Sequence, residues 1–174
     1  MKADVYSIWL MPEAAWGREF SAIVETLAAR FSAPRFVPHL TIIGGRPFSR
    51  ADLARRVAPI AAASAPIETS ILGVALGTSF FRSFYALFPA EGPLLELKRR
   101  TDLAVLGADS AEFMPHVSLL YGPVPQHPKA EAAVEMRARL ADRRVRFERI
   151  EIVRSGDEVP IAEWETVDSF ALSA

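Results

Sequence analysis

The feature that most constrains this chain is a short motif that occurs twice. Residues 38–44 read Pro-His-Leu-Thr-Ile-Ile-Gly, and residues 115–122 read Pro-His-Val-Ser-Leu-Leu-Tyr-Gly. Each copy is an apolar run that follows a proline and ends at a glycine, a pattern typical of a short buried β-strand. A helical pattern comes before and after each copy. Two matched strands in one chain therefore favour a duplicated fold.

The motif places polar side chains at a fixed spacing. On a strand, side chains at positions i and i+2 share a face and lie about 6.6 Å apart. Each copy therefore presents an imidazole beside a hydroxyl, His39 with Thr41 and His116 with Ser118. The intervening apolar side chains point to the opposite face, where they anchor the strand on a core. Two such strands around one cleft would bring two imidazoles and two hydroxyls together.

That set of groups suits displacement at a cyclic phosphodiester. One neutral imidazole can take a proton from the attacking water, and a protonated one can give a proton to the departing sugar oxygen. Both states are populated near neutrality because the ordinary histidine pKa is about 6.5. The hydroxyls can donate hydrogen bonds to the non-bridging phosphoryl oxygens. This scheme requires neither a metal nor a cofactor. A zinc site, the competing interpretation, would need more ligands, and only His127 remains as a third histidine.

The composition limits the partners. The chain has 20 Lys and Arg, 21 Asp and Glu and a formal net charge of -1, so it lacks the basic excess that binding to a long polyanion usually needs. A small-molecule cyclic phosphate nucleotide is therefore the expected partner, and long nucleic acid is not. The absence of cysteine excludes thiolate zinc sites and cysteine nucleophiles. No signal peptide or membrane-spanning apolar run is recognised, so a cytoplasmic protein without membrane attachment is expected. A monomer is expected as well.

The periodicity along the chain predicts an α+β fold. Strand patterns occur at 4–11, 39–43, 66–76, 80–88, 116–121, 145–153 and 164–172. Helical patterns cover 16–31, a segment capped by Ser49, a segment opened by Pro93, and 128–141. The basic run 98–100 is expected on a solvated helix face. Nothing resembling a linker divides the chain, so we expect one domain over residues 1–174.

The motifs resemble those of the two-histidine (2H) phosphoesterase superfamily, which is defined by paired His-x-Thr/Ser elements. Within it the chain is most similar to the cyclic phosphodiesterases of the plant and fungal type. The similarity includes residues 6–9, 36–39, 77–81, 114–122 and 155–165. It implies a bilobal, pseudo-two-fold fold in which two antiparallel sheets line a central cleft, with helices outside. It also implies hydrolysis of nucleoside 2′,3′-cyclic phosphates to 2′-phosphates and of ADP-ribose 1″,2″-cyclic phosphate to the 1″-phosphate.

The resemblance assigns expected roles to the motif residues. His39 and His116 would be the catalytic acid and base, and Thr41 and Ser118 would bind the phosphate. One of the two histidines would protonate the 3′ oxygen, and the sequence leaves open which one.

Three aromatic residues are expected to contact substrate: Trp9, Phe81 and Tyr121. Core packing is the alternative for Trp9 and Phe81. Strict alternation along the second motif places Tyr121 on the face opposite His116, unless the strand bends before Gly122.

Two other functions stay open. The first is an enzyme of RNA ends, like the bacterial 2′,5′-RNA ligase-like members of the superfamily, which would be expected to need a basic track. The second is a non-catalytic nucleotide-binding module.

Arg82 stands where the relatives considered have an uncharged polar residue. We interpret it as a solvated edge residue, although a guanidinium there could reach a phosphate.

Overall fold

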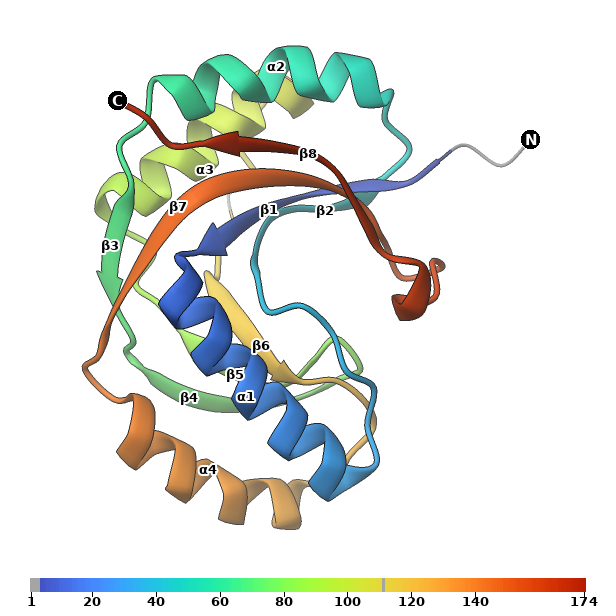
Figure 1. The fold of residues 1–174 in the computed structure, drawn as a ribbon, viewed down its shortest axis with the longest axis vertical. Coiled ribbons are helices and arrows are strands. Elements are labelled where there is room, and N and C mark those ends of the chain that lie inside the picture. Colours follow the sequence, from blue (N-terminus) through green and yellow to red (C-terminus); the bar gives the residue numbers. More distant parts are fainter. Residues whose placement is uncertain (1–3, 111) are drawn as a thin grey trace.

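Strands form the centre of the molecule. The computed structural model describes residues 4–110 and 112–174, and in these ranges eight strands form one antiparallel sheet (Figure 1). Seven of them follow the hydrogen-bonded order β3-β7-β1-β2-β6-β5-β4, and β8 pairs with β7. The strands are β1 (Tyr6–Pro12), β2 (Leu40–Arg46), β3 (Ile67–Ser70), β4 (Gly73–Ser79), β5 (Arg82–Leu87), β6 (His116–Leu120), β7 (Arg144–Arg154) and β8 (Glu165–Ala171).

The path has two halves, and they meet at the strands that carry the repeated motif. One half contains β3, β7, β1, β2 and β8, and the other contains β6, β5 and β4. A single register pair, Leu40 with Val117, joins β2 to β6. The expected bilobal α+β fold is confirmed, with one refinement: the two expected sheets are joined into one path at this pair.

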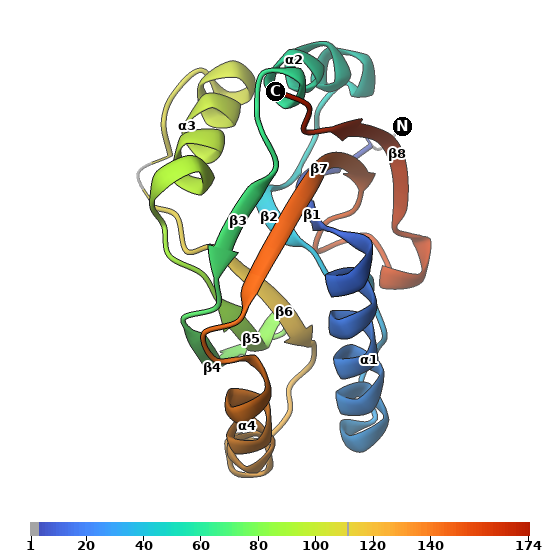
Figure 2. The ribbon, with the colours of Figure 1, turned by 60° about the vertical axis from the view of Figure 1, so that its left-hand side comes forward.

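The four α-helices of the described ranges cover the two ends of this arrangement. They are α1 (Ala14–Phe31), α2 (Arg50–Ala62), α3 (Gly92–Leu106) and α4 (Gln126–Leu140). Helices α2 and α3 pack together beside the β7 half, and α1 and α4 pack against the β6 half, as both views show (Figures 1 and 2). None of the helices in the described ranges is both long and apolar enough to cross a bilayer.

Local sequence explains where the helices begin and which faces they bury. The periodic apolar residues predicted on the first helix are buried in α1: Trp16, Phe20, Ile23, Val24 and Leu27. Ser49 caps α2, because its hydroxyl oxygen accepts a hydrogen bond from the Asp52 backbone N–H at 3.4 Å. Pro93 lies in the first turn of α3, where its missing N–H costs nothing.

The strand expected over 66–76 is wrong as a single element. It divides into β3 and β4, because the chain changes partners between two adjacent residues. The Ile71 backbone N–H donates to Arg143, next to β7, whereas the Leu72 N–H donates to Leu87 on β5. The two apolar runs are therefore parts of different halves. A short 3₁₀ helix (Ile161–Glu163) before β8 was also not predicted.

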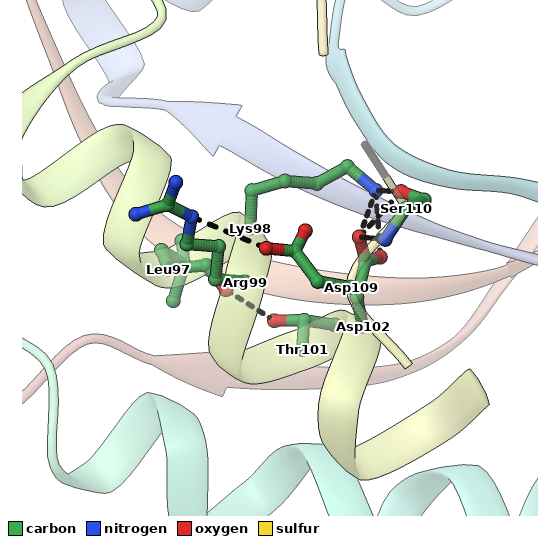
Figure 3. Close-up of polar contacts among 7 residues, drawn as sticks. All are labelled: Leu97, Lys98, Arg99, Thr101, Asp102, Asp109 and Ser110. Carbon is green, nitrogen blue, oxygen red and sulfur yellow. Dashed lines mark hydrogen bonds and ion pairs between the residues drawn. The ribbon is translucent and has the colours of Figure 1, made fainter. Parts of the chain in front are cut away.

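The basic run of α3 is not wholly solvated as expected, since Lys98 lies in a buried polar cluster (Figure 3). Lys98 is 6% exposed, and its Nζ lies 2.6 and 2.7 Å from the two carboxylate oxygens of Asp102, which is fully buried. The Ser110 hydroxyl accepts from Lys98 Nζ at 2.8 Å, and the Ser110 backbone N–H donates to Asp102 at 3.1 Å. The cluster thus ties the loop after α3 to the helix, on the chain segment that leads to the second motif.

Candidate active site

The two copies of the motif line one open cavity of about 620 Å³. His39 directly precedes β2 and Thr41 lies on it, while His116 and Ser118 lie on β6. The other predicted site residues line the same cavity: Trp9 from β1, Phe81 from the β4–β5 turn, and Tyr121 just after β6. The structure thus brings all seven residues together, as the duplicated fold requires, while their individual roles remain predictions.

The histidines have matching hydrogen bonds. His39 Nδ1 lies 2.7 Å from the Val37 carbonyl oxygen, and His116 Nδ1 lies 2.8 Å from that of Met114. In both copies the acceptor is the carbonyl two residues earlier. Since a carbonyl only accepts, Nδ1 carries the hydrogen in each ring, and Nε2 of the neutral imidazole is left as the proton acceptor. The Pro-His element therefore sets the same tautomer twice, which residue spacing alone did not reveal.

His39 has an apolar setting. It is 7% exposed, and its ring stacks on Trp9 with centroids 3.5 Å apart and planes 6° from parallel. Burial lowers the pKa of His39 to about 4, because desolvation penalises the charged ring; the Val37 hydrogen bond opposes this effect and the charge of His116 adds to it. His39 is therefore neutral at neutral pH and can act as a proton acceptor.

His116 lies in a more open setting. It is half-buried, and the edge of the Tyr85 ring faces it with centroids 5.3 Å apart. Burial lowers the pKa of His116 too; the Met114 hydrogen bond partly offsets this effect, and the positive charge of Arg82 lowers the pKa further. Because His116 is less buried than His39, its charged form is penalised less by desolvation. The two rings are thus chemically inequivalent.

The two hydroxyls also differ. The Ser118 hydroxyl donates to the Phe81 carbonyl oxygen at 2.9 Å. The Thr41 hydroxyl has no hydrogen-bond partner within the part of the chain that the structure describes. Ser118 therefore ties β6 to the β4–β5 turn and must rotate to donate to a ligand, whereas Thr41 is free to do so.

Aromatic rings form a continuous wall of the cavity. Sequence reasoning missed Trp164, which lies between the 3₁₀ helix and β8. Its ring centroid is 5.6 Å from that of Trp9, 5.9 Å from that of Phe81 and 6.1 Å from that of Tyr121. Its indole N–H donates to the Val159 carbonyl at 3.0 Å, which fixes the ring. The resemblance extended over 155–165, but nothing in the sequence indicated that Trp164 faces the cavity.

The position of Tyr121 shows why alternation fails at the end of the second motif. Strand β6 ends at Leu120, and Gly122 has φ of 112°, which side-chain-bearing residues rarely adopt. Tyr121 is thereby released from the strand pattern, lines the cavity and stacks on Phe36 with centroids 3.6 Å apart. The bend considered from the sequence is present.

The polar side chains that the two motifs bring to the cavity are imidazoles and hydroxyls. In the described ranges, no three His, Cys, Asp or Glu side chains gather as a possible metal-binding group. His127 lies on α4 with its side chain 92% exposed, and it does not line the cavity. The arrangement can transfer protons at Nε2 of His39 and of His116.

Comparison with known proteins identifies the family. A family model described as the 2′-5′ RNA ligase superfamily matches residues 11–158. The chain belongs to this superfamily. This confirms the two-histidine phosphoesterase family expected from the paired motifs, and with it an enzyme that acts on phosphodiester bonds.

Individual relatives agree with this assignment. The chain is 28% identical over 172 residues to the cyclic phosphodiesterase of Arabidopsis thaliana, covering 96% of this chain and 94% of the relative. The crystal structure of E. coli LigT complexed with 3′-AMP has a TM-score of 0.63 at 12% identity and covers 99% of this chain and 100% of LigT. The crystal structure of TT0787 of Thermus thermophilus has a TM-score of 0.61 at 21% identity, covering 97% of each chain. These two structures share the fold.

Proposed function

We propose that this protein is a metal-independent cyclic phosphodiesterase that opens nucleoside 2′,3′-cyclic phosphates and leaves the phosphate on the 2′ oxygen. ADP-ribose 1″,2″-cyclic phosphate would be opened by the same chemistry. The observation that carries the proposal is the pair of imidazoles with matching tautomers, His39 and His116, in one cavity. The similarity to a cyclic phosphodiesterase over nearly the whole chain supports it.

The environments of the two histidines favour one division of roles. His39 is neutral, so its Nε2 takes a proton from water as the water oxygen bonds to phosphorus. The bond from phosphorus to the 3′ oxygen breaks, and Nε2–H of protonated His116 gives its proton to that oxygen. Thr41 and Ser118 donate hydrogen bonds to the non-bridging oxygens. The products are a 2′-phosphate and a free 3′ hydroxyl, and both rings regain their starting states by proton exchange with solvent.

The aromatic wall supplies the binding surface for the rest of a small substrate. Trp9, Phe81 and Tyr121 line the cavity and give it apolar surface for a base or ribose. Trp9 is also stacked on His39, so it serves both the catalytic ring and the cavity wall. A small nucleotide, rather than long nucleic acid, is consistent with the net charge of -1.

The direct test is turnover of 2′,3′-cyclic AMP in the presence of EDTA, with products resolved by chromatography against 2′-AMP and 3′-AMP. We expect 2′-AMP, and loss of activity in the His116→Ala variant. Formation of 3′-AMP would disprove the proposed bond cleavage, and unchanged activity in His116→Ala would disprove its role. Tight binding without turnover at any pH would instead indicate a binding module.

The same assay addresses action on RNA ends, which the superfamily assignment also allows. A short oligonucleotide ending in a 2′,3′-cyclic phosphate is compared with the mononucleotide. We expect kcat/KM for the mononucleotide to be equal or higher. A clear preference for the oligonucleotide would show that the enzyme acts on RNA ends.

A further inference from the structure

One permanently charged basic side chain lines the cavity. Among the described residues that line it, Arg82 is the only lysine or arginine and Asp157 the only carboxylate residue. They belong to different halves, Arg82 at the start of β5 and Asp157 in the segment after β7. Because His39 is neutral at neutral pH, a phosphate in this cavity meets a permanent positive charge only at Arg82.

Arg82 lies beside the second motif. Its guanidinium carbon is 6.0 Å from the centroid of the Tyr85 ring, and that ring faces His116 with centroids 5.3 Å apart. The charge of Arg82 is also close enough to lower the pKa of His116. The guanidinium is therefore placed near the imidazole that we propose as the acid.

Arg82 has no carboxylate partner within the described ranges, whereas most arginines of the surface do. Arg50 pairs with Asp168 at 2.9 Å, and Arg139 with Glu19 at 2.8 Å. A charge left unpaired beside a polar cavity is available to an anionic ligand, and a guanidinium matches phosphate oxygens in two-point contacts.

The backbone on both sides of Arg82 is held in place. The Phe81 carbonyl accepts from the Ser118 hydroxyl at 2.9 Å. The Ser83 hydroxyl and carbonyl accept from Lys129 Nζ at 3.1 and 3.2 Å, and Lys129 is 1% exposed. This turn is thus braced from the motif strand and from α4, so the guanidinium extends from a fixed point.

We propose that Arg82 is a phosphate-binding residue of this cavity, whose guanidinium binds the non-bridging oxygens of the phosphoryl group held between the two motifs. This inference rests on the proposed function for its substrate, and it names the residue that supplies positive charge. The cyclic diester carries one negative charge, whereas the ring-opened product carries nearly two at neutral pH. Arg82 therefore binds the product more tightly than the substrate, and it makes the enzyme sensitive to inhibition by 2′-phosphates and by inorganic phosphate.

The test measures inorganic phosphate binding by calorimetry, independently of turnover, for the wild type, Arg82→Gln, Arg82→Lys and Arg137→Gln. Arg137 is an exposed arginine on α4 away from the cavity, so its variant matches the change in net charge. We expect Arg82→Gln to weaken phosphate binding about 10-fold or more, Arg82→Lys to be intermediate, and Arg137→Gln to match the wild type. Circular dichroism and thermal unfolding verify that the variants fold.

Kinetics of 2′,3′-cyclic AMP hydrolysis provide a second readout. In Arg82→Gln we expect a higher KM and weaker inhibition by 2′-AMP. We also expect the fall of kcat/KM at alkaline pH to move to higher pH, because the guanidinium that lowers the pKa of His116 is gone.

Any of three results would overturn the proposal. Arg82→Gln could bind phosphate as tightly as the wild type, Arg137→Gln could lose as much phosphate affinity as Arg82→Gln, or the wild type could fail to bind phosphate. Phosphate binding that depends on Arg82 in a protein that hydrolyses no cyclic phosphate would overturn the proposed function alone.

Discussion

The histidines of the first and second copies of the motif make the same hydrogen bond to the backbone but lie in different surroundings. In both, Nδ1 of the histidine bonds the carbonyl two residues earlier, and Nε2 is left for proton transfer. His39 is buried against Trp9 with a pKa of about 4, while His116 is half-buried beside Tyr85, and the charge of Arg82 lowers its pKa. Duplication thus supplies two imidazoles with the same tautomer, and burial and charge make them inequivalent, with His39 penalised more than His116 for carrying a proton; the proposed division into base and acid rests on this difference.

The largest effect is expected from removing each imidazole. His39→Ala and His116→Ala should each lower kcat/KM for 2′,3′-cyclic AMP by about 10²–10⁴-fold. An analogue with sulfur at the 3′ bridging position separates the roles, because a thiolate leaves without a proton. We expect the analogue to restore much of the activity of His116→Ala but not of His39→Ala. Restoration of the His39 variant instead would reverse the assignment. His127→Ala, at an exposed site on α4, is the control and should match the wild type.

The difference in burial should also appear in stability as a function of pH. Unfolded His39 binds a proton below its ordinary pKa of 6.5, whereas the folded ring resists protonation until about pH 4. The free energy of unfolding should therefore fall as pH drops from 6.5 to 4, by up to about 3 kcal/mol from this residue. Urea unfolding at several pH values measures this effect. His39→Gln should remove it, and His116→Gln should remove less because His116 is more exposed. An equal effect of the two variants would contradict the comparison.

The glycines at the ends of the two motifs differ in how closely other atoms surround them. A Cβ on Gly45 would lie 2.7 Å from the Gly156 Cα and from the Ser155 carbonyl oxygen, so Gly45→Ala should cost about 1–3 kcal/mol of stability. Gly122→Ala meets no atom within 4 Å but is strained by φ of 112°, at a cost of about 1–2 kcal/mol. Gly44→Ala has open space and an ordinary φ, and is the control. Chemical denaturation ranks the three, and a destabilised Gly44→Ala would contradict the packing explanation.

The smallest expected effect distinguishes the hydroxyls. Ser118→Ala loses the hydrogen bond to the Phe81 carbonyl, so it should lower the free energy of unfolding by about 0.5–1.5 kcal/mol. Thr41→Val should leave stability nearly unchanged, because that hydroxyl has no partner in the described ranges. Both variants should lower kcat/KM, since each removes a proposed phosphate donor. Equal stability of the two variants would show that the Ser118 bond contributes little in solution.

Much of the fold follows from local patterns, and the failures have long-range causes. The period of Trp16, Phe20 and Ile23 predicts α1 because the helix buries one face. The separation of β3 from β4 depends on whether a backbone N–H pairs with the segment beside β7 or with β5, which local propensity does not encode. The pattern misplaces Lys98 because the Lys98–Asp102 pair, one turn apart on α3, would be equally possible on a solvated face; its burial depends on tertiary packing and on the loop residue Ser110, which the helix pattern does not encode. The compartment, monomeric state and one-domain organisation expected from the sequence stay predictions.

The sequence by itself determined which imidazole and hydroxyl are paired in each motif, because both copies of Pro-His-x-Thr/Ser place them two residues apart and because the period of a strand is two. The tertiary structure alone decided how the two copies differ. Burial against Trp9, the charge of Arg82 and the ring of Trp164 all come from other strands or loops. Desolvation and Coulomb interactions depend on distance in space rather than on position along the chain.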